Sequence, residues 1–300
     1  MLMIKAFLLI SAALQDHRAA VADEQIFPLD MAPNSVDDLY VGCKKNMASL
    51  VEKELLNIEL NSSPELKMLW QDANKNHKPP EDNLKEIHSI AIYVYTNSRF
   101  TVYQDFNNAV RSDKEKYKDK TYSWYSLQFL LTEAIQILKE TQNGCKSTYR
   151  GTDVTFDTNV LNKQIRFGQF ASSSVYLTEA QVFGIKSCFE ITTCEGANLS
   201  KYSVFSNESE VLIPPYEVFE ITEVKTRTPE KDLWCETVYV LKSTGVRSDL
   251  NCDWFRRPIK SMRNTSRFSY SQRRVYTRGG PKQTSKRRRP GVSRGTFSLA

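Results

Sequence analysis

Residues 123–145 have the sequence SWYSLQFLLTEAIQILKETQNGC, and the fold class depends on what precedes and follows them. Leucine, isoleucine and alanine recur at helical spacing through Ser123–Thr141, which predicts an amphipathic helix with one buried face. Asn143 and Gly144 favour the end of that helix, because both tolerate the left-handed backbone that closes helices. After Cys145, segments rich in valine, isoleucine, phenylalanine, tyrosine and threonine alternate with turn residues, as strands do.

Four further helices are expected before this one, at residues 36–60, 64–74, 83–95 and 100–111. Candidate strands follow it at 147–150, 165–173, 188–193, 201–205, 210–213, 216–225 and 237–243, with one short helix at 178–183. Helices first and strands second predict an α+β fold, in which a helical N-terminal half precedes a strand-rich core. No G-x-G-x-x-G follows a strand, so a Rossmann dinucleotide site is unsupported.

The two ends of the chain differ in composition from the middle. Residues 1–22 have the pattern of a secretory signal peptide, with Lys5, the apolar run Ala6–Leu14 and cleavage candidates at Ala22 or Ala13. From Trp254 onward there are 14 lysines and arginines and no acidic residue. The whole chain has a net charge of +6, so the residues before Trp254 have a net charge of −8. Residues 256–300 are therefore expected to be a disordered basic tail or a pro-segment, and 23–255 a single domain.

The cysteines also point to an oxidising compartment, where most of them should be paired. The six cysteines are Cys43, Cys145, Cys188, Cys194, Cys235 and Cys252. Six cysteines allow 15 disulfide connectivities, and their spacing alone does not choose among these. No C-x-x-C occurs and the chain has only three histidines, so a zinc site and histidine-dependent nucleophilic catalysis are poorly supported. The sequence has no second apolar run long enough to cross a bilayer and no hydrophobic C-terminal anchor signal. We expect a soluble protein that is secreted or stored in secretory granules.

Two carboxylates, Glu208 and Glu210, stand one residue apart just before the apolar run 211–213. On an extended backbone they would point to the same side and could enter one pocket. Paired carboxylates are common where a sugar carbon becomes positively charged in a transition state. An isolated Glu-x-Glu is more often a solvated surface feature, so its meaning depends on other motifs.

Two such motifs lie upstream. Tyr149-Arg150-Gly151 ends a predicted strand, where an arginine could grip a phosphate and a glycine would let backbone approach closely. The run 167–174, FGQFASSS, places Ser172 on a strand led by aromatic residues. Each motif alone is common.

In this order, Arg, then aromatic-x-Ser-x-Ser, then Glu-x-Glu before an apolar strand, the motifs resemble those of vertebrate ecto-type mono-ADP-ribosyltransferases. The resemblance covers nearly the whole chain, and the Glu-x-Glu form is similar to members that modify arginine. It implies an ADP-ribosyltransferase-like β core, NAD as co-substrate, no metal, and arginine-containing proteins or small guanidino compounds as acceptors. The chain looks like one of the soluble secreted members.

The resemblance also implies roles for individual residues. Arg150 would bind the NAD diphosphate and ribose, Ser172 would hold the nicotinamide ribose, and Glu210 would be the catalytic carboxylate. Glu208 would select and activate the acceptor guanidinium. Further NAD contacts are expected from Tyr95, Gln169 and Ser206, the last within a loop at 202–210 that would present the acceptor. The implied disulfides are Cys43–Cys252 and Cys145–Cys194, which leaves Cys188 and Cys235 as a third bridge or as free thiols.

Two alternatives remain open. The same fold could work mainly as an NAD glycohydrolase with water as acceptor, or the protein could bind polyanions through residues 256–300. Four N-x-S/T sequons are present, at Asn61, Asn198, Asn207 and Asn264. Asn207 abuts the carboxylate pair, so we expect it to be unglycosylated in active protein.

Overall fold

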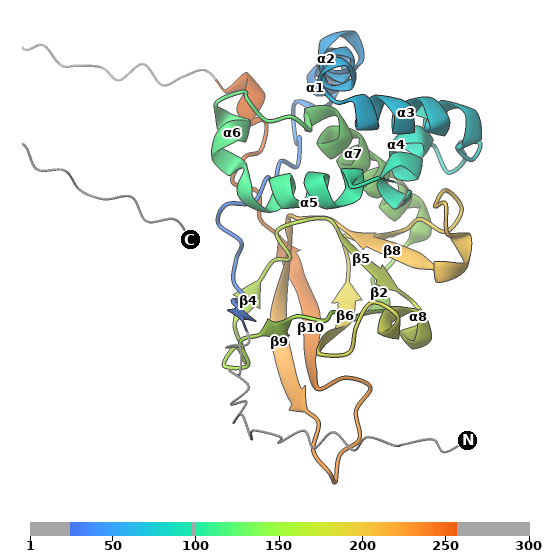
Figure 1. The fold of residues 1–300 in the computed structure, drawn as a ribbon. Helices are drawn as coiled ribbons and strands as arrows, with labels where there is room; N and C mark the ends of the chain where they lie inside the picture. The colour runs from blue at the N-terminus through green and yellow to red at the C-terminus, as the bar shows by residue number, and fades with distance from the viewer. Residues whose placement is uncertain (1–24, 98–99, 257–300) are drawn as a thin grey trace, which may run out of the picture. The chain divides into compact units, whose positions relative to one another are not determined.

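The computed structural model describes residues 25–97 and 100–256 (Figure 1). These residues belong to one compact unit. The expected signal peptide, and all but the first residue of the expected basic tail, lie outside the described residues. Both expectations, and polyanion contact through the tail, therefore stay without structural support.

Helices make up the first half of the unit, as predicted. They are α1 (Lys44–Leu50), a π-helical turn (Val51–Leu55), α2 (Leu56–Ser62), α3 (Pro64–Asn76), α4 (Glu86–Thr96), α5 (Val102–Ser112), α6 (Lys114–Lys118) and α7 (Tyr125–Gln142). α3 begins at the predicted proline, where the Ser63 side chain caps it by accepting from the Leu66 amide at 3.2 Å. The short α6 was not predicted.

The first helix is shorter than the expected 36–60, because residues 36–43 are not helical. Tyr40 and Gly42 have left-handed backbones, with φ of 56° and 93°. The Asp37 carboxylate accepts from the amides of residues 249 and 250, and Asp38 accepts from that of Cys252. These long-range bonds tie the segment to the end of the unit and override its helical pattern.

The second half forms an eight-stranded sheet in the order β4-β9-β10-β6-β2-β5-β8-β7, in which only the β10–β6 pair is parallel. Its strands are β2 (Lys146–Arg150), β4 (Gln164–Ile165), β5 (Ala171–Ser174), β6 (Ser187–Thr193), β7 (Ala197–Asn198), β8 (Glu210–Ile213), β9 (Glu217–Thr226) and β10 (Thr237–Val246). A separate parallel pair joins β1 (Ile26–Phe27) to β3 (Thr155–Phe156), and α8 (Leu177–Gln181) follows β5.

Two predicted strands differ from what the structure shows. The segment 165–173 is split into β4 and β5, with Gly168 in the left-handed region between them at φ 69°. Residues 201–205 form turns instead of a strand.

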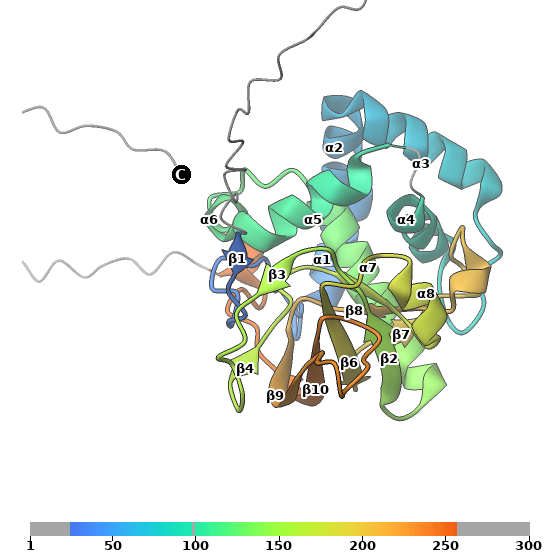
Figure 2. The same cartoon turned by 60° about the horizontal axis from the view of Figure 1, so that its bottom comes forward.

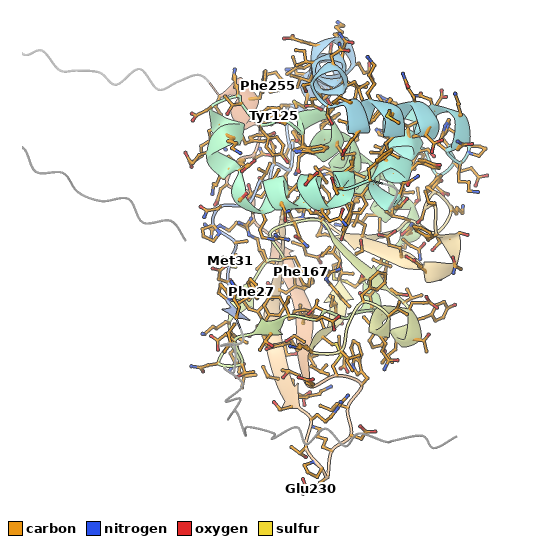
Figure 3. All side chains as sticks on the ribbon, in the orientation of Figure 1. Phe27, Met31, Tyr125, Phe167, Glu230 and Phe255 are labelled. Atoms are coloured by element: carbon orange, nitrogen blue, oxygen red, sulfur yellow. A yellow bond between two sulfur atoms is a disulfide. The ribbon has the colours of Figure 1, made fainter. Side chains whose placement is uncertain are left out.

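Two cores lie on opposite faces of β5 and β8. Leu212 belongs to the large cluster built by the helices, whereas its neighbour Ile213 belongs to a second cluster with strands of the other half of the sheet. The alternation follows from the two-residue period of a strand. Phe167, labelled in Figure 3, packs against the second cluster. Its ring lies edge-on to those of Phe189 and Phe219, at centroid distances of 5.5 and 5.6 Å. β5 and β8 are thus fixed from both sides.

Three disulfides close the unit: Cys43–Cys252, Cys145–Cys194 and Cys188–Cys235. The first two match the pairs that the resemblance implied, and the third joins the two cysteines whose state the sequence left open. Disulfides of this kind fit a protein exposed to an extracellular, oxidising environment. Among the described residues, no helix combines the length and the apolar character that crossing a membrane requires.

Candidate active site

The candidate site lies where the sheet opens between β2 and β5. These strands share a single paired position, Tyr149 with Ser174, whereas β2 and β6 are paired from Lys146 to Arg150. A pocket of about 560 Å³ opens at this place, within the usual size range of ligand sites, roughly 300–1,000 Å³. It is lined by Tyr95, Thr96, Asn97, Tyr103, Gln104, Tyr149, Arg150, Gly151, Thr152, Asp153, Ser172, Ser173, Ser174, Ala180, Phe183, Phe205, Glu208 and Glu210.

Arg150 is the last residue of β2 and spans the opening of the sheet. Its Nη1 donates to the Ser172 carbonyl oxygen at 2.6 Å, so the guanidinium is anchored to β5 on the far side. The side chain is half-buried, lines the pocket and has further N–H donors besides this one. This geometry suits a positive group that binds an anionic part of a ligand.

Gly151 allows α8 to pack against β2 (Figure 2). A Cβ at this position would lie 2.3 Å from the carbonyl oxygens of both Ala180 and Gly184. The sequence had suggested that a glycine here permits close backbone approach. The backbone that approaches is that of α8 and the residue three positions after it.

We expect Gly151→Ala to lower the free energy of unfolding by about 1–3 kcal/mol, because two carbonyl groups must move to admit the methyl group. The measurement is the midpoint of urea unfolding, followed by circular dichroism. α8 would shift away from β2, so ligand binding in the pocket should weaken as well. An unchanged midpoint would contradict the packing role of Gly151.

Ser172 is positioned by a buried tyrosine beneath it. Tyr95 Oη lies 3.5 Å from Ser172 Oγ, donates to the Phe170 carbonyl at 3.1 Å and accepts from Asn107 Nδ2 at 3.2 Å. Tyr95 is 1% exposed and lines the pocket. Asn107, on α5, was missed, since no sequence signal links it to a tyrosine on another helix.

Glu210 is the first residue of β8 and pairs across the sheet with Ser174. The pKa of its carboxyl is raised to about 7, chiefly by burial. The nearby charge of Glu208 also raises this pKa, whereas hydrogen bonds from Ser172 and Ser203 and the charge of Arg150 oppose the rise. Ser203 Oγ donates to Glu210 Oε2 at 3.4 Å and was not singled out from the sequence. A carboxyl group titrating near neutral pH in a pocket is typical of functional sites.

Glu208 reaches the same pocket by a different route from the one expected. It ends a 3₁₀ turn (Ser206–Glu208), and Ser209 has a left-handed backbone with φ 48° and ψ 45°. The two glutamates are therefore not i and i+2 of one extended strand, although both line the pocket. Ser174 Oγ donates to the Glu208 carbonyl at 2.6 Å and holds the turn against β5. The pKa of Glu208 is raised by partial burial and by the charge of Glu179.

Two expected NAD-contact residues do not line this pocket. The Gln169 side-chain oxygen accepts from the Arg111 guanidinium. Ser206 is exposed at the start of the 3₁₀ turn, and Asn207, whose sequon overlaps the site, is exposed beside it. In residues 25–97 and 100–256 no group of three or more His, Cys, Asp and Glu side chains could hold a metal ion.

Comparisons with known proteins agree with this geometry. Residues 29–235 match the family model ART, described as NAD:arginine ADP-ribosyltransferase. Ecto-ADP-ribosyltransferase 5 of Homo sapiens is 38% identical over 212 residues, which cover 66% of this chain and 72% of that protein. GPI-linked NAD(P)(+)--arginine ADP-ribosyltransferase 1 of Mus musculus is 32% identical over 279 residues, covering 84% of this chain and 83% of that protein.

Solved structures give the same result at the level of the fold. A mutant of the eucaryotic mono-ADP-ribosyltransferase ART2.2, crystallised in complex with NADH, is 32% identical and superposes with a TM-score of 0.62. The match covers 75% of this chain and 98% of that one. The architecture is thus that of a mono-ADP-ribosyltransferase. The chain belongs to the NAD:arginine ADP-ribosyltransferase family, which confirms the family, the fold class and the enzyme class expected from the sequence.

Proposed function

We propose that this enzyme transfers ADP-ribose from NAD to arginine side chains and releases nicotinamide. The observation that carries the proposal is the convergence of Arg150, Ser172, Glu210 and Glu208 on one pocket at the opening between β2 and β5. The names of its relatives support the same choice of donor and acceptor. The assignments of individual residues below are part of the proposal.

Arg150 and Ser172 bind and orient NAD in this proposal. The Arg150 guanidinium carries the positive charge that the NAD diphosphate requires, and its bond to the Ser172 carbonyl fixes its direction. Ser172 Oγ is placed next to both Tyr95 and Glu210, so that it can hold a ribose hydroxyl and the catalytic carboxylate together. Tyr95 acts through Ser172 from beneath.

Glu210 stabilises the reacting sugar. The bond between the ribose C1′ and the nicotinamide nitrogen breaks, and nicotinamide leaves with the bonding electron pair. Positive charge develops on the ribose, and the buried Glu210 carboxylate stabilises it. The burial that raises the pKa of Glu210 also places its charge in a region of low dielectric, where the stabilisation is strongest.

Glu208 prepares the acceptor. A guanidinium is protonated at neutral pH and is a poor nucleophile. From the 3₁₀ turn at the pocket wall, the Glu208 carboxylate orients the guanidinium and takes a proton from it as its nitrogen bonds to C1′. Without a bound guanidinium, water can attack the same carbon, which yields free ADP-ribose.

The test of this function uses radiolabelled NAD and agmatine, a small guanidino compound. We expect the intact protein to form ADP-ribosyl-agmatine and to release one nicotinamide for each adduct at saturating agmatine. Product identity is established by mass spectrometry. Nicotinamide release that does not respond to agmatine and leaves only free ADP-ribose would show a glycohydrolase instead.

The same proposal includes the compartment. Three disulfides and the similarity to proteins named as ecto-enzymes support an extracellular protein, and we propose that it is secreted. Its acceptors would then be arginines of extracellular proteins.

A further inference from the structure

One face of α8 and its C-terminal turn exposes charged and apolar side chains that packing does not explain. Glu179, Val182 and Phe183 stand three and four residues apart, so they share one face of the helical turn. The turn is continuous, since the Val182 amide donates to the Glu179 carbonyl and the Phe183 amide to that of Ala180. Val182 is 78% exposed and Phe183 59%. With Tyr176, which precedes the helix and is 57% exposed, these residues are called the α8 rim.

The exposure is concentrated here. Four of the 13 exposed large hydrophobic residues within the described ranges fall between positions 176 and 185. Isolated exposed hydrophobic residues are ordinary, but clustered ones beside a polar site mark interaction surfaces. Ala180 is buried, so α8 is anchored on one side while the rim is open on the other.

The rim is continuous with the candidate active site. Phe183 lines the pocket, and on the side of Glu208 the partly exposed Phe205 lines it as well. A single hydroxyl links the two elements: Ser174 Oγ donates to the Glu208 carbonyl at 2.6 Å and accepts from the Tyr176 amide at 3.0 Å. Glu179 lies near enough to Glu208 to raise its pKa. Glu208, the carboxylate proposed to prepare the acceptor, thus has a second carboxylate and an apolar surface beside it.

We propose that the α8 rim docks the acceptor protein and sets a sequence preference around the target arginine. The fitting segment carries a large apolar side chain next to that arginine, which packs on Val182, and a second cation, which pairs with Glu179. Charge complementarity supports this occupant, because two neighbouring carboxylates favour a segment with more than one positive charge. The inference rests on the proposed function and specifies its protein acceptors.

The test compares three acceptors: agmatine, a peptide with one arginine flanked by phenylalanine and lysine, and the same peptide with serine at both flanking places. With the intact protein we expect kcat/KM for the Phe/Lys peptide to exceed that for the serine peptide by about 10-fold, from apolar burial and one ion pair. Val182→Ser should remove about 5-fold of this preference, and Glu179→Gln about 3-fold. Val182→Ser should not alter agmatine transfer by more than about 2-fold, because Val182 does not line the pocket and agmatine has no large apolar side chain to pack on it.

Val246→Ser is the matched control, since Val246 is an exposed valine on β10 that does not line the pocket. It should leave all three acceptors unchanged. Equal kcat/KM for the two peptides, or a Val182→Ser defect of the same size for agmatine and peptide, would overturn the docking role. A wild-type protein that modifies neither agmatine nor peptide while hydrolysing NAD would instead overturn the proposed function, and the docking role with it.

Discussion

Replacing Glu210 with glutamine is expected to reduce nicotinamide release from NAD by about 10²–10³-fold or more, whether agmatine or water is the acceptor. The amide keeps the shape of the side chain and removes the negative charge that stabilises the developing positive charge on the ribose. The bond to Ser203 can persist, since an amide oxygen accepts as a carboxylate oxygen does. The measurement is single-turnover release of nicotinamide at pH 8, with Glu223→Gln, an exposed glutamate on β9, as the charge-matched control.

The same carboxyl group predicts a pH profile. Burial raises its pKa to about 7, so in the free enzyme the reactive carboxylate is increasingly protonated below that pH. We expect kcat/KM for NAD to fall as the pH drops through 7, and Glu210→Gln to lose this dependence. Because the raised pKa makes the protonated form the more favourable one in the fold, this group stabilises the native state at low pH, and the contribution is lost as the pH rises through 7. Glu210→Gln should therefore unfold at the same or a higher temperature at pH 8. A marked drop in that temperature would mean that the activity loss reflects folding.

The sequence predicted the secondary-structure elements around the site better than the long-range contacts that bring its side chains together. β8 begins at Glu210 and ends at Ile213 as predicted, because an apolar run bounded by a polar triplet and a proline pair is a strong local pattern. Residues 201–205 have a similar alternation, yet they form turns. There the Ser203 hydroxyl accepts from the Phe205 amide, and the Thr96 hydroxyl from the Val204 amide. A hydrogen bond to a residue far away in the chain produces no periodic pattern in the sequence, so the pattern could not predict it.

The relation between Glu208 and Glu210 shows the same limit. Spacing alone suggested one extended strand, whereas the left-handed Ser209 separates a 3₁₀ turn from β8. A non-glycine residue adopts that backbone only when its surroundings support it, and here the Ser209 carbonyl accepts from the Val175 amide at 3.4 Å while Ser174 holds the Glu208 carbonyl. Both contacts come from β5 and its end, a strand that the sequence placed in the site without predicting its register against β8.

That separation of the two glutamates allows their roles to be separated by experiment. Glu208→Gln is expected to lower transfer to agmatine by about 10²-fold or more while NAD hydrolysis stays within about threefold of wild type. Glu208 lies on the turn at the pocket wall and has no hydrogen bond to Ser172 or Arg150 through which it would hold NAD, as far as the described residues show. The acceptor guanidinium would lose the carboxylate that orients it and takes its proton, whereas water needs no such selection.

The assay measures ADP-ribosyl-agmatine and free ADP-ribose in the same reaction, so that the ratio of the two products reports on Glu208 independently of protein concentration. Glu223→Gln is the matched control: it removes an exposed carboxylate on β9 that does not line the pocket and should leave the ratio for agmatine unchanged. A parallel loss of both products in Glu208→Gln would assign this residue to the NAD ribose together with Glu210. Unchanged amounts of both products would place the acceptor elsewhere on the pocket wall, away from the 3₁₀ turn.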